Sequence, residues 1–152
     1  MNQYMQEAIK EARTGIQGGD GGPFGCVIVR DGKIVGRGHN EVVKRKDSTC
    51  HGEMMAIRQA CKTLDSFDLS GCELYTTGEP CPMCRGAILW ANIRKVYYGC
   101  HVKDTEGIGF RDKVFYEFSE TEGGEAFMEE LDRGQCLELY REYQNIADKT
   151  RY

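Results

Sequence analysis

Two short segments, residues 51–53 (His-Gly-Glu) and 80–84 (Pro-Cys-Pro-Met-Cys), contain the residue types most suited to chemistry. The imidazole of His51 and the thiolates of Cys81 and Cys84 are three good ligands for zinc, and they leave the fourth tetrahedral position to a water. Glu53 follows the first ligand closely without being an obvious member of the set. A carboxylate there can take a proton from that water and deliver it to a substrate nitrogen. The two segments therefore predict a hydrolytic zinc site.

Both ligand groups lie at the start of stretches with helical character. Cys81 and Cys84 are three residues apart at the beginning of a predicted helix, so both sulfurs can turn toward one point. The unpaired N–H groups and the dipole at that helix end favour thiolate over thiol. His51 is expected in the first turn of another helix, after capping-type residues at 47–49. Two thiolates and a neutral imidazole make the zinc site formally neutral, so that its water can ionise near neutral pH.

Two other interpretations of the cysteines compete with this one. Cys50 could be the fourth ligand of a closed structural zinc site, but it is too close to His51 in sequence to form a separate knuckle easily. Cys81 and Cys84 could instead form a redox pair, since Cys-x-x-Cys also occurs in thiol oxidoreductases. Neither a structural site nor a redox pair has a use for Glu53. The catalytic interpretation is therefore favoured.

The rest of the chain alternates between strand and helix patterns. Apolar residues at helical spacing predict a first helix over 1–16, which runs into a glycine-rich stretch. Strands are predicted over 24–29, 33–38, 72–77, 95–99 and 126–131. Further helices are predicted around 57–64, over 81–91 and over 136–147, with a polar loop at 41–49 and a loop with a short helix at 107–117. This order predicts an α/β fold, a three-layer α/β/α sandwich around a mixed five-stranded sheet, in a single domain over 1–152.

Length and composition narrow the class of protein. A chain of 152 residues with 40% hydrophobic residues fits one domain with one core. A formal net charge of -4 argues against a general nucleic-acid binder, and the basic cluster at 44–46 is interpreted as a solvated loop. Eight cysteines without an apolar signal segment suit reduced thiols in the cytoplasm. No apolar run approaches the roughly 18 residues of a membrane span, so we expect a cytoplasmic protein without one.

The pattern His-x-Glu…Pro-Cys-x-x-Cys is typical of zinc-dependent nucleobase deaminases, which remove an amino group hydrolytically as ammonia. The chain resembles the cytidine-deaminase-like superfamily and, within it, the small bacterial guanine deaminases. The resemblance covers nearly the whole chain. Besides the zinc motifs it includes the segments at 21–25, 38–40 and 109–112 and the terminal Tyr152. It implies a zinc aminohydrolase of purine metabolism that converts guanine to xanthine.

The resemblance also implies roles for individual residues in catalysis. His51, Cys81 and Cys84 are implied as the zinc ligands, and Glu53 as the proton shuttle between water, ring nitrogen and departing amine. Asp112 is implied as an acceptor for ring N–H groups or the leaving amine, and as a second proton carrier. Asp112 could alternatively cap the short helix that follows it.

Substrate contacts are implied in the same way. Asn40 is implied to hydrogen-bond the base, Phe24 to pack against the ring face, and Trp90 to line the pocket. Tyr152 is implied to reach into the active site of a partner subunit, because the family forms domain-swapped homodimers in which residues from about 134 to 152 are exchanged. The alternatives are a turn residue for Asn40, core packing for Phe24 and Trp90, and a free terminus for Tyr152.

Other substrates stay open. A deaminase for guanosine, cytosine or another base, or for adenosine in transfer RNA, would use the same zinc motifs, and a binding module could retain the zinc without turnover. A transfer-RNA enzyme would be expected to have a basic last helix, whereas here Glu138 and Glu142 accompany Arg141. Gly52 stands where the superfamily commonly has alanine, and Cys50 is an uncommon neighbour of the ligand. Neither departure removes a catalytic group.

Overall fold

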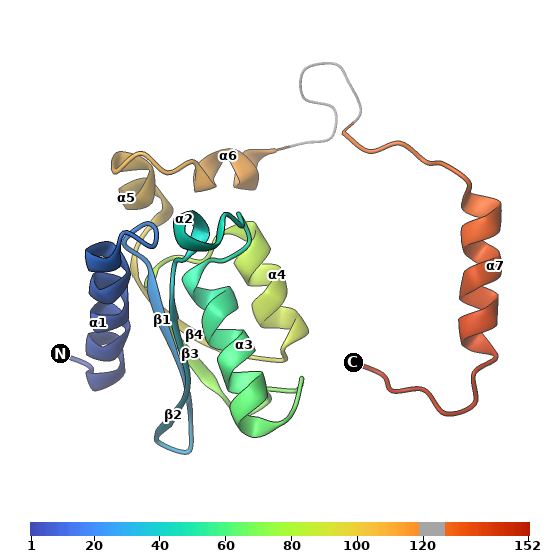
Figure 1. Ribbon diagram of the computed structural model, residues 1–152, viewed down its shortest axis with the longest axis horizontal. Helices are drawn as coiled ribbons and strands as arrows, with labels where there is room; N and C mark the ends of the chain where they lie inside the picture. The colour runs from blue at the N-terminus through green and yellow to red at the C-terminus, as the bar shows by residue number, and fades with distance from the viewer. Residues whose placement is uncertain (119–126) are drawn as a thin grey trace. The chain divides into compact units, whose positions relative to one another are not determined.

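The computed structural model describes residues 1–118 and 127–152 and divides into two units, Met1–Tyr116 and Glu117–Tyr152. The first unit contains a four-stranded sheet with helices on both faces (Figure 1). The described part of the second unit contains the helix α7 (Arg133–Gln144). Each unit is described by itself below.

The sheet of the first unit is mixed. Its strands are β1 (Gly25–Arg30), β2 (Lys33–His39), β3 (Glu73–Gly78) and β4 (Lys95–Cys100), in the spatial order β2-β1-β3-β4. β1 runs antiparallel to β2 and β3, whereas β3 and β4 are parallel. These strands confirm four predicted segments to within one or two residues.

Successive side chains of β1 point to opposite faces of the sheet, and each face is covered by helices. Val27 and Val29 are buried with Ala8 of helix α1 (Gln3–Gly18) on one face of the sheet. Cys26 and Ile28 are buried on the other face, in a larger core shared with α3 (Gly52–Leu64) and α4 (Pro82–Trp90). Figure 1 shows α1 on one side of the strands and α3 and α4 on the other. The predicted three-layer α/β/α arrangement is therefore confirmed in this unit.

Close approach of the helices to the sheet depends on strand glycines. A Cβ added at Gly25 would collide with the carbonyl oxygen of Ala8 in α1. A Cβ at Gly36 would collide with the carbonyl oxygen of Ala56 in α3, and one at Gly38 would lie 2.6 Å from the Cβ of Met55. The absent side chains therefore set the distance between both helices and the sheet.

Three short helices lie in the connections of the first unit. The predicted polar loop at 41–49 contains α2 (Val42–Arg45), and the predicted loop at 107–117 ends in α6 (Asp112–Glu117). A further helix, α5 (Val102–Gly107), begins directly after β4 with His101 and Asp104 forming a capping box. This helix was absent from the prediction, because it is too short to show a helical period.

The second unit contains α7 (Arg133–Gln144), none of whose residues is buried. Lys149 donates to the carbonyl oxygens of Tyr143 and Gln144 and so satisfies the C-terminal end of the helix. The predicted fifth strand is wrong for residues 127–131, which are irregular, while residue 126 lies outside the described residues. Two neighbouring acidic residues, Glu129 and Glu130, interrupt the apolar pattern, and a strand this short forms only on a neighbouring strand.

None of the helices in the described parts of the chain has the length and apolar character that a bilayer crossing requires.

Candidate active site

The three predicted zinc ligands lie together at the starts of two helices. His51 is the N-cap of α3, Cys81 is the N-cap of α4, and Cys84 lies in the first turn of α4. The Nδ1 atom of His51 lies 3.5 Å from the sulfur of Cys81 and 3.7 Å from that of Cys84. Tetrahedral zinc with ordinary bond lengths separates a nitrogen from a sulfur ligand by roughly 3.6 Å. The donor atoms therefore fit zinc in type and in spacing.

The two thiols differ in acidity without the metal. A hydrogen bond from Cys84, together with the neighbouring His51 ring, lowers the pKa of Cys81. The bond to Cys81, together with burial, raises the pKa of Cys84. The His51 pKa is raised, chiefly by its hydrogen bond with Cys81. The pair thus holds one thiolate readily, and a divalent cation is needed to favour the second.

Cys50 does not join this cluster. Its buried sulfur contacts Nη1 of Arg58 at 3.7 Å, and the cluster of possible metal ligands consists of His51, Cys81 and Cys84. A closed site with Cys50 as fourth ligand is therefore not the arrangement found. All eight cysteines, including Cys81 and Cys84, are free thiols.

Glu53 lies in the first turn of α3, beside the ligands, and is only 6% exposed. The fully buried hydroxyl of Thr76 on β3 donates to Glu53 Oε1 at 2.7 Å and also lies 3.2 Å from the carbonyl oxygen of Gly78. This contact fixes the orientation of the carboxylate beside the zinc ligands. The sequence prediction did not include Thr76; the signal available was a hydroxyl residue within an otherwise buried strand.

A cavity of about 690 Å³ opens beside the ligands, entirely within the first unit. His51, Glu53, Asn40, Phe24 and Asp112 all line it, so the structure brings these predicted residues together. Its volume is ample for a purine base.

One wall of the cavity is aromatic. The Phe24 ring meets the ring of Phe110 edge to face, with 4.9 Å between centroids. Gly22 makes room for the pair, because a Cβ there would lie 2.6 Å from Phe110 and 2.8 Å from Phe24. The prediction named Phe24 alone, although Phe110 belongs to the segment at 109–112 that carried the resemblance.

Asn40 is held in a definite orientation at 5% exposure. Its Oδ1 accepts from the backbone N–H of Val42 at 3.1 Å, and its own backbone N–H donates to the carbonyl oxygen of Phe24. The turn role and the pocket position therefore coexist. Because Oδ1 is engaged, the Nδ2 group is the one that remains to donate to a ligand.

Asp112 lies in the first turn of α6 and is half-buried. Burial raises the pKa of its carboxyl, and the nearby Cys81 charge raises it further. A carboxyl with a raised pKa is suited to hold and release a proton.

Two predicted substrate contacts lie elsewhere. Trp90 is at the C-terminal end of α4, 68% exposed, and does not line the cavity. Tyr152 belongs to the second unit and is 79% exposed. The structure of the first unit thus assembles the zinc ligands, Glu53, Asn40, Phe24 and Asp112, but not Trp90.

An α/β sandwich with His51 and Glu53 at the start of one helix and Cys81 and Cys84 at the start of another is typical of zinc-dependent deaminases. Residues 1–100 match the model of the cytidine and deoxycytidylate deaminase zinc-binding region. The chain therefore belongs to the cytidine and deoxycytidylate deaminase zinc-binding family, and zinc is its metal.

The relatives differ in how much of the chain they match. A guanine deaminase from Bacillus subtilis is 38% identical over 151 residues, covering 98% of this chain and 97% of the relative. The X-ray structure of guanine deaminase from that organism superimposes with a TM-score of 0.89 at 39% identity, over 100% of this chain and 99% of the other. A tRNA-specific adenosine deaminase from Aquifex aeolicus is 40% identical over 105 residues, covering 69% of each chain.

Proposed function

We propose that this protein is a guanine deaminase, which hydrolyses guanine to xanthine and ammonia in purine salvage or catabolism. The observation that carries the proposal is the cavity beside the zinc ligands: His51, Cys81, Glu53, Asn40 and Asp112 line it together. Among the relatives, the guanine deaminase matches nearly the whole chain, whereas the tRNA-specific enzyme matches 69% of it.

Proton transfer is assigned to Glu53. When bound by His51, Cys81 and Cys84, zinc supplies Lewis-acid activation of a water molecule near neutral pH. The carboxylate of Glu53 accepts one proton from the attacking water and delivers it to the ring nitrogen, where it stays in the product. It then carries the second proton, from the added hydroxyl, to the amine, which leaves as ammonia. Thr76 holds one carboxylate oxygen, so the carboxylate reacts from one orientation.

Recognition of guanine is assigned to the cavity walls. Guanine presents N–H donors and also acceptors, so its pocket needs an acceptor and a donor. Asp112 supplies the acceptor and the Nδ2 group of Asn40 the donor, while Phe24 packs on a ring face. A base with the wrong edge leaves one of these groups unpaired in the pocket, at a cost of about 1–3 kcal/mol.

We also propose a homodimer in which the C-terminal segment, about 134–152, is exchanged and brings Tyr152 to the partner's site. Helix α7 has no buried residue and exposes Leu139, Tyr140 and Tyr143, which is unfavourable for an isolated helix. In the first unit, β4 is an edge strand beside an apolar cavity of about 650 Å³. In a dimer, the apolar side chains of α7 can be covered by a second copy of the chain, and so can the apolar cavity beside β4. Free cysteines support the proposed cytoplasmic location.

The test is ammonia release by the zinc-loaded protein from guanine, with guanosine, adenine, cytosine, cytidine and a transfer-RNA anticodon stem-loop in parallel. Release from guanine alone is the expected result. Release from another member would retain the zinc chemistry and overturn the guanine assignment. Silence across the panel with zinc bound would favour a binding module.

A further inference from the structure

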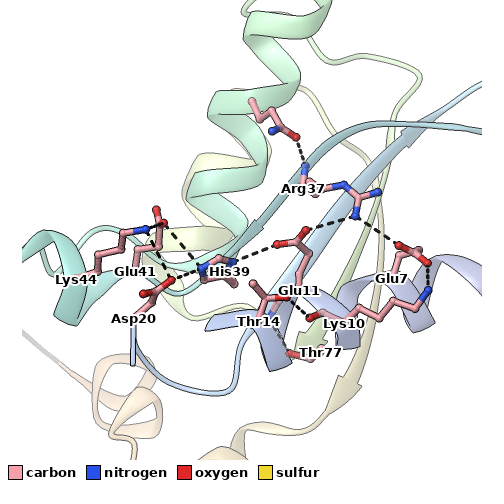
Figure 2. A network of polar contacts seen from close by, with 12 residues as sticks. Glu7, Lys10, Glu11, Thr14, Asp20, Arg37, His39, Glu41, Lys44 and Thr77 are labelled. Carbon is pink, nitrogen blue, oxygen red and sulfur yellow. Dashed lines mark hydrogen bonds and ion pairs between the residues drawn. The ribbon is translucent and has the colours of Figure 1, made fainter. Parts of the chain in front are cut away.

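A histidine outside the zinc site lies between two carboxylates. The Nδ1 atom of His39 is 3.1 Å from Glu11 Oε2, and its Nε2 atom is 2.7 Å from Asp20 Oδ2. Both ring nitrogens thus face carboxylate oxygens, and the protonated ring is the form that donates to both. Figure 2 shows His39, at the end of β2, between Glu11 and Asp20.

The network ties three segments together. Glu11 belongs to α1, Asp20 to the connection between α1 and β1, and His39 is the last residue of β2. The ring also lies against the end of α1, since a Cβ at Gly15 would come within 2.6 Å of it. His39 therefore joins α1 to the end of β2, and Asn40 follows His39 directly in the chain.

Asp20 extends the network to the wall of the substrate cavity. Its backbone carbonyl accepts from the N–H groups of Val43 and Lys44, each at 3.0 Å, and so holds the first turn of α2. Val42 and Val43 line the cavity, and Val42 donates to the side chain of Asn40. A shift of Asp20 would consequently move both α2 and the amide of Asn40.

The same cluster does not need a metal ion. Asp20, His39 and Glu41 have the spacing of possible metal ligands. Lys44 Nζ, however, lies 3.5 Å from Glu41 and 4.0 Å from Asp20, and Nε2 of His39 lies 3.9 Å from Glu41. The protein's own cations therefore neutralise these carboxylates.

We propose that His39 is a positioning residue for the substrate pocket: its bridge between Glu11 and Asp20 fixes the wall formed by α2 and Asn40, and this wall sets the affinity for the purine. The inference rests on the proposed function, because the affinity concerned is that for guanine. His39 touches neither the zinc ligands nor Glu53, so it acts on binding more than on the chemical step.

The charges around His39 give the proposal a pH dependence. Burial by itself would lower the pKa of His39, but hydrogen bonds to Asp20 and Glu11 and the charge of Glu41 raise it above its ordinary value. Lys44 and Arg37, the nearby cations, contact the same carboxylates as His39. The bridge is therefore complete below the ordinary histidine pKa of about 6.5 and is lost as the pH rises through the raised pKa.

The experiment compares His39→Gln with Arg37→Gln. Both variants remove a group that contacts Glu11. Arg37 pairs with Glu7 and Glu11 and does not line the cavity, so it is the matched control. His39→Gln is expected to raise KM for guanine about 10-fold at pH 7, as expected when charge-assisted hydrogen bonds are lost, with kcat little changed. In Arg37→Gln, KM should be unchanged. The wild-type KM should rise toward pH 9, and that of His39→Gln should stay flat.

Amide hydrogen exchange of residues 20–24 and 40–45 gives a readout that needs no substrate, and it should quicken in His39→Gln. An unchanged KM, an equal rise of KM in both variants, or unchanged exchange would overturn the positioning role. A wild-type protein inactive on guanine would instead overturn the proposed function, and the exchange measurement would still decide whether the bridge holds the wall. If His39→Gln does not fold, the pH dependence of the wild-type KM and exchange decides.

Discussion

The two units of this protein, Met1–Tyr116 and Glu117–Tyr152, treat their apolar side chains in opposite ways. In the first, helices α1, α3 and α4 bury small and branched residues against both faces of a sheet. In the second, α7 has the length of an ordinary globular helix, yet Leu139, Tyr140 and Tyr143 are at least half exposed. The units also differ in their polar side chains. The first unit buries Glu53, Asn40 and Thr76, whereas α7 has no buried residue.

This difference separates two tasks. Buried polar groups with fixed partners are suited to chemistry, because they do not have to reorganise during the reaction. An exposed apolar helix is suited to association, because covering it releases free energy. The first unit should therefore determine the chemical step, and the second should determine assembly and the completion of the pocket.

The strongest test of this division is Glu53→Gln. Glutamine keeps the shape of the side chain but cannot carry the proton, so turnover of guanine should fall at least about 1,000-fold. Zinc content, measured by elemental analysis, should be unchanged. The exposed Glu106 of α5 provides the control, since Glu106→Gln should behave as wild type. Near-normal turnover in Glu53→Gln would remove the proton shuttle from the first unit.

The second test concerns assembly. Leu139→Ser combined with Tyr143→Ser removes two apolar side chains one helical turn apart on α7, and should weaken the dimer about 100-fold. Sedimentation equilibrium measures this change, with Arg141→Gln on the same helix as the control. An unaltered sedimentation profile, or a wild-type protein that is monomeric, would contradict exchange of the C-terminal segment.

Deletion of Tyr152 asks whether the second unit also completes the pocket. Loss of one aromatic contact worth about 1.4 kcal/mol would reduce kcat/KM for guanine about 10-fold. Arg151→Gln, one residue earlier, is the control, and the dimer should persist in both. Full activity after the deletion would favour a free terminus and restrict the pocket to the first unit.

Thr76→Val examines preorganisation inside the first unit. Valine has nearly the same shape but cannot hold Glu53 Oε1, so kcat should fall about 5-fold while KM and zinc content stay constant. Thr76→Ser keeps the hydroxyl and should restore kcat. If valine and serine prove equivalent, the hydrogen bond has no part in orienting the carboxylate.

The smallest effect is expected in the pH dependence of stability. Since the His39 pKa is raised in the folded protein, its contribution is fully present below its ordinary value of about 6.5 and is lost as the pH rises through the raised pKa. The melting temperature of the wild type should therefore decline toward pH 9 by a few degrees more than that of His39→Gln. Parallel profiles would show that the bridge contributes nothing to stability.

The zinc ligands and four strands could be predicted because each rests on a local pattern. His51, Cys81 and Cys84 lie at helix starts that are recognisable from capping and spacing, and β1 is a nearly continuous apolar run. Such signals can be recognised in the sequence without knowledge of distant contacts. The predicted positions of Phe24 and Asn40 in the pocket agree with the structure for a different reason, namely the resemblance to a family.

Other features depend on contacts between distant segments. Thr76 meets Glu53 across 23 positions of sequence, and His39 meets Glu11 across 28. A single sequence carries no signal for such pairings. The fifth strand failed for a related reason, because a strand requires a neighbouring edge, and the pattern at 127–131 does not specify one.

The strand glycines have a consequence for engineering. Replacing glycine by alanine is a common way to stabilise a protein, because it restricts the unfolded chain. At Gly25 and Gly36 that route is closed, since a side chain at Gly25 would push α1 off the sheet and one at Gly36 would push α3 off it. Gly86 in α4 has open space around its Cβ direction, so a thermostable variant should begin there and leave the sheet untouched.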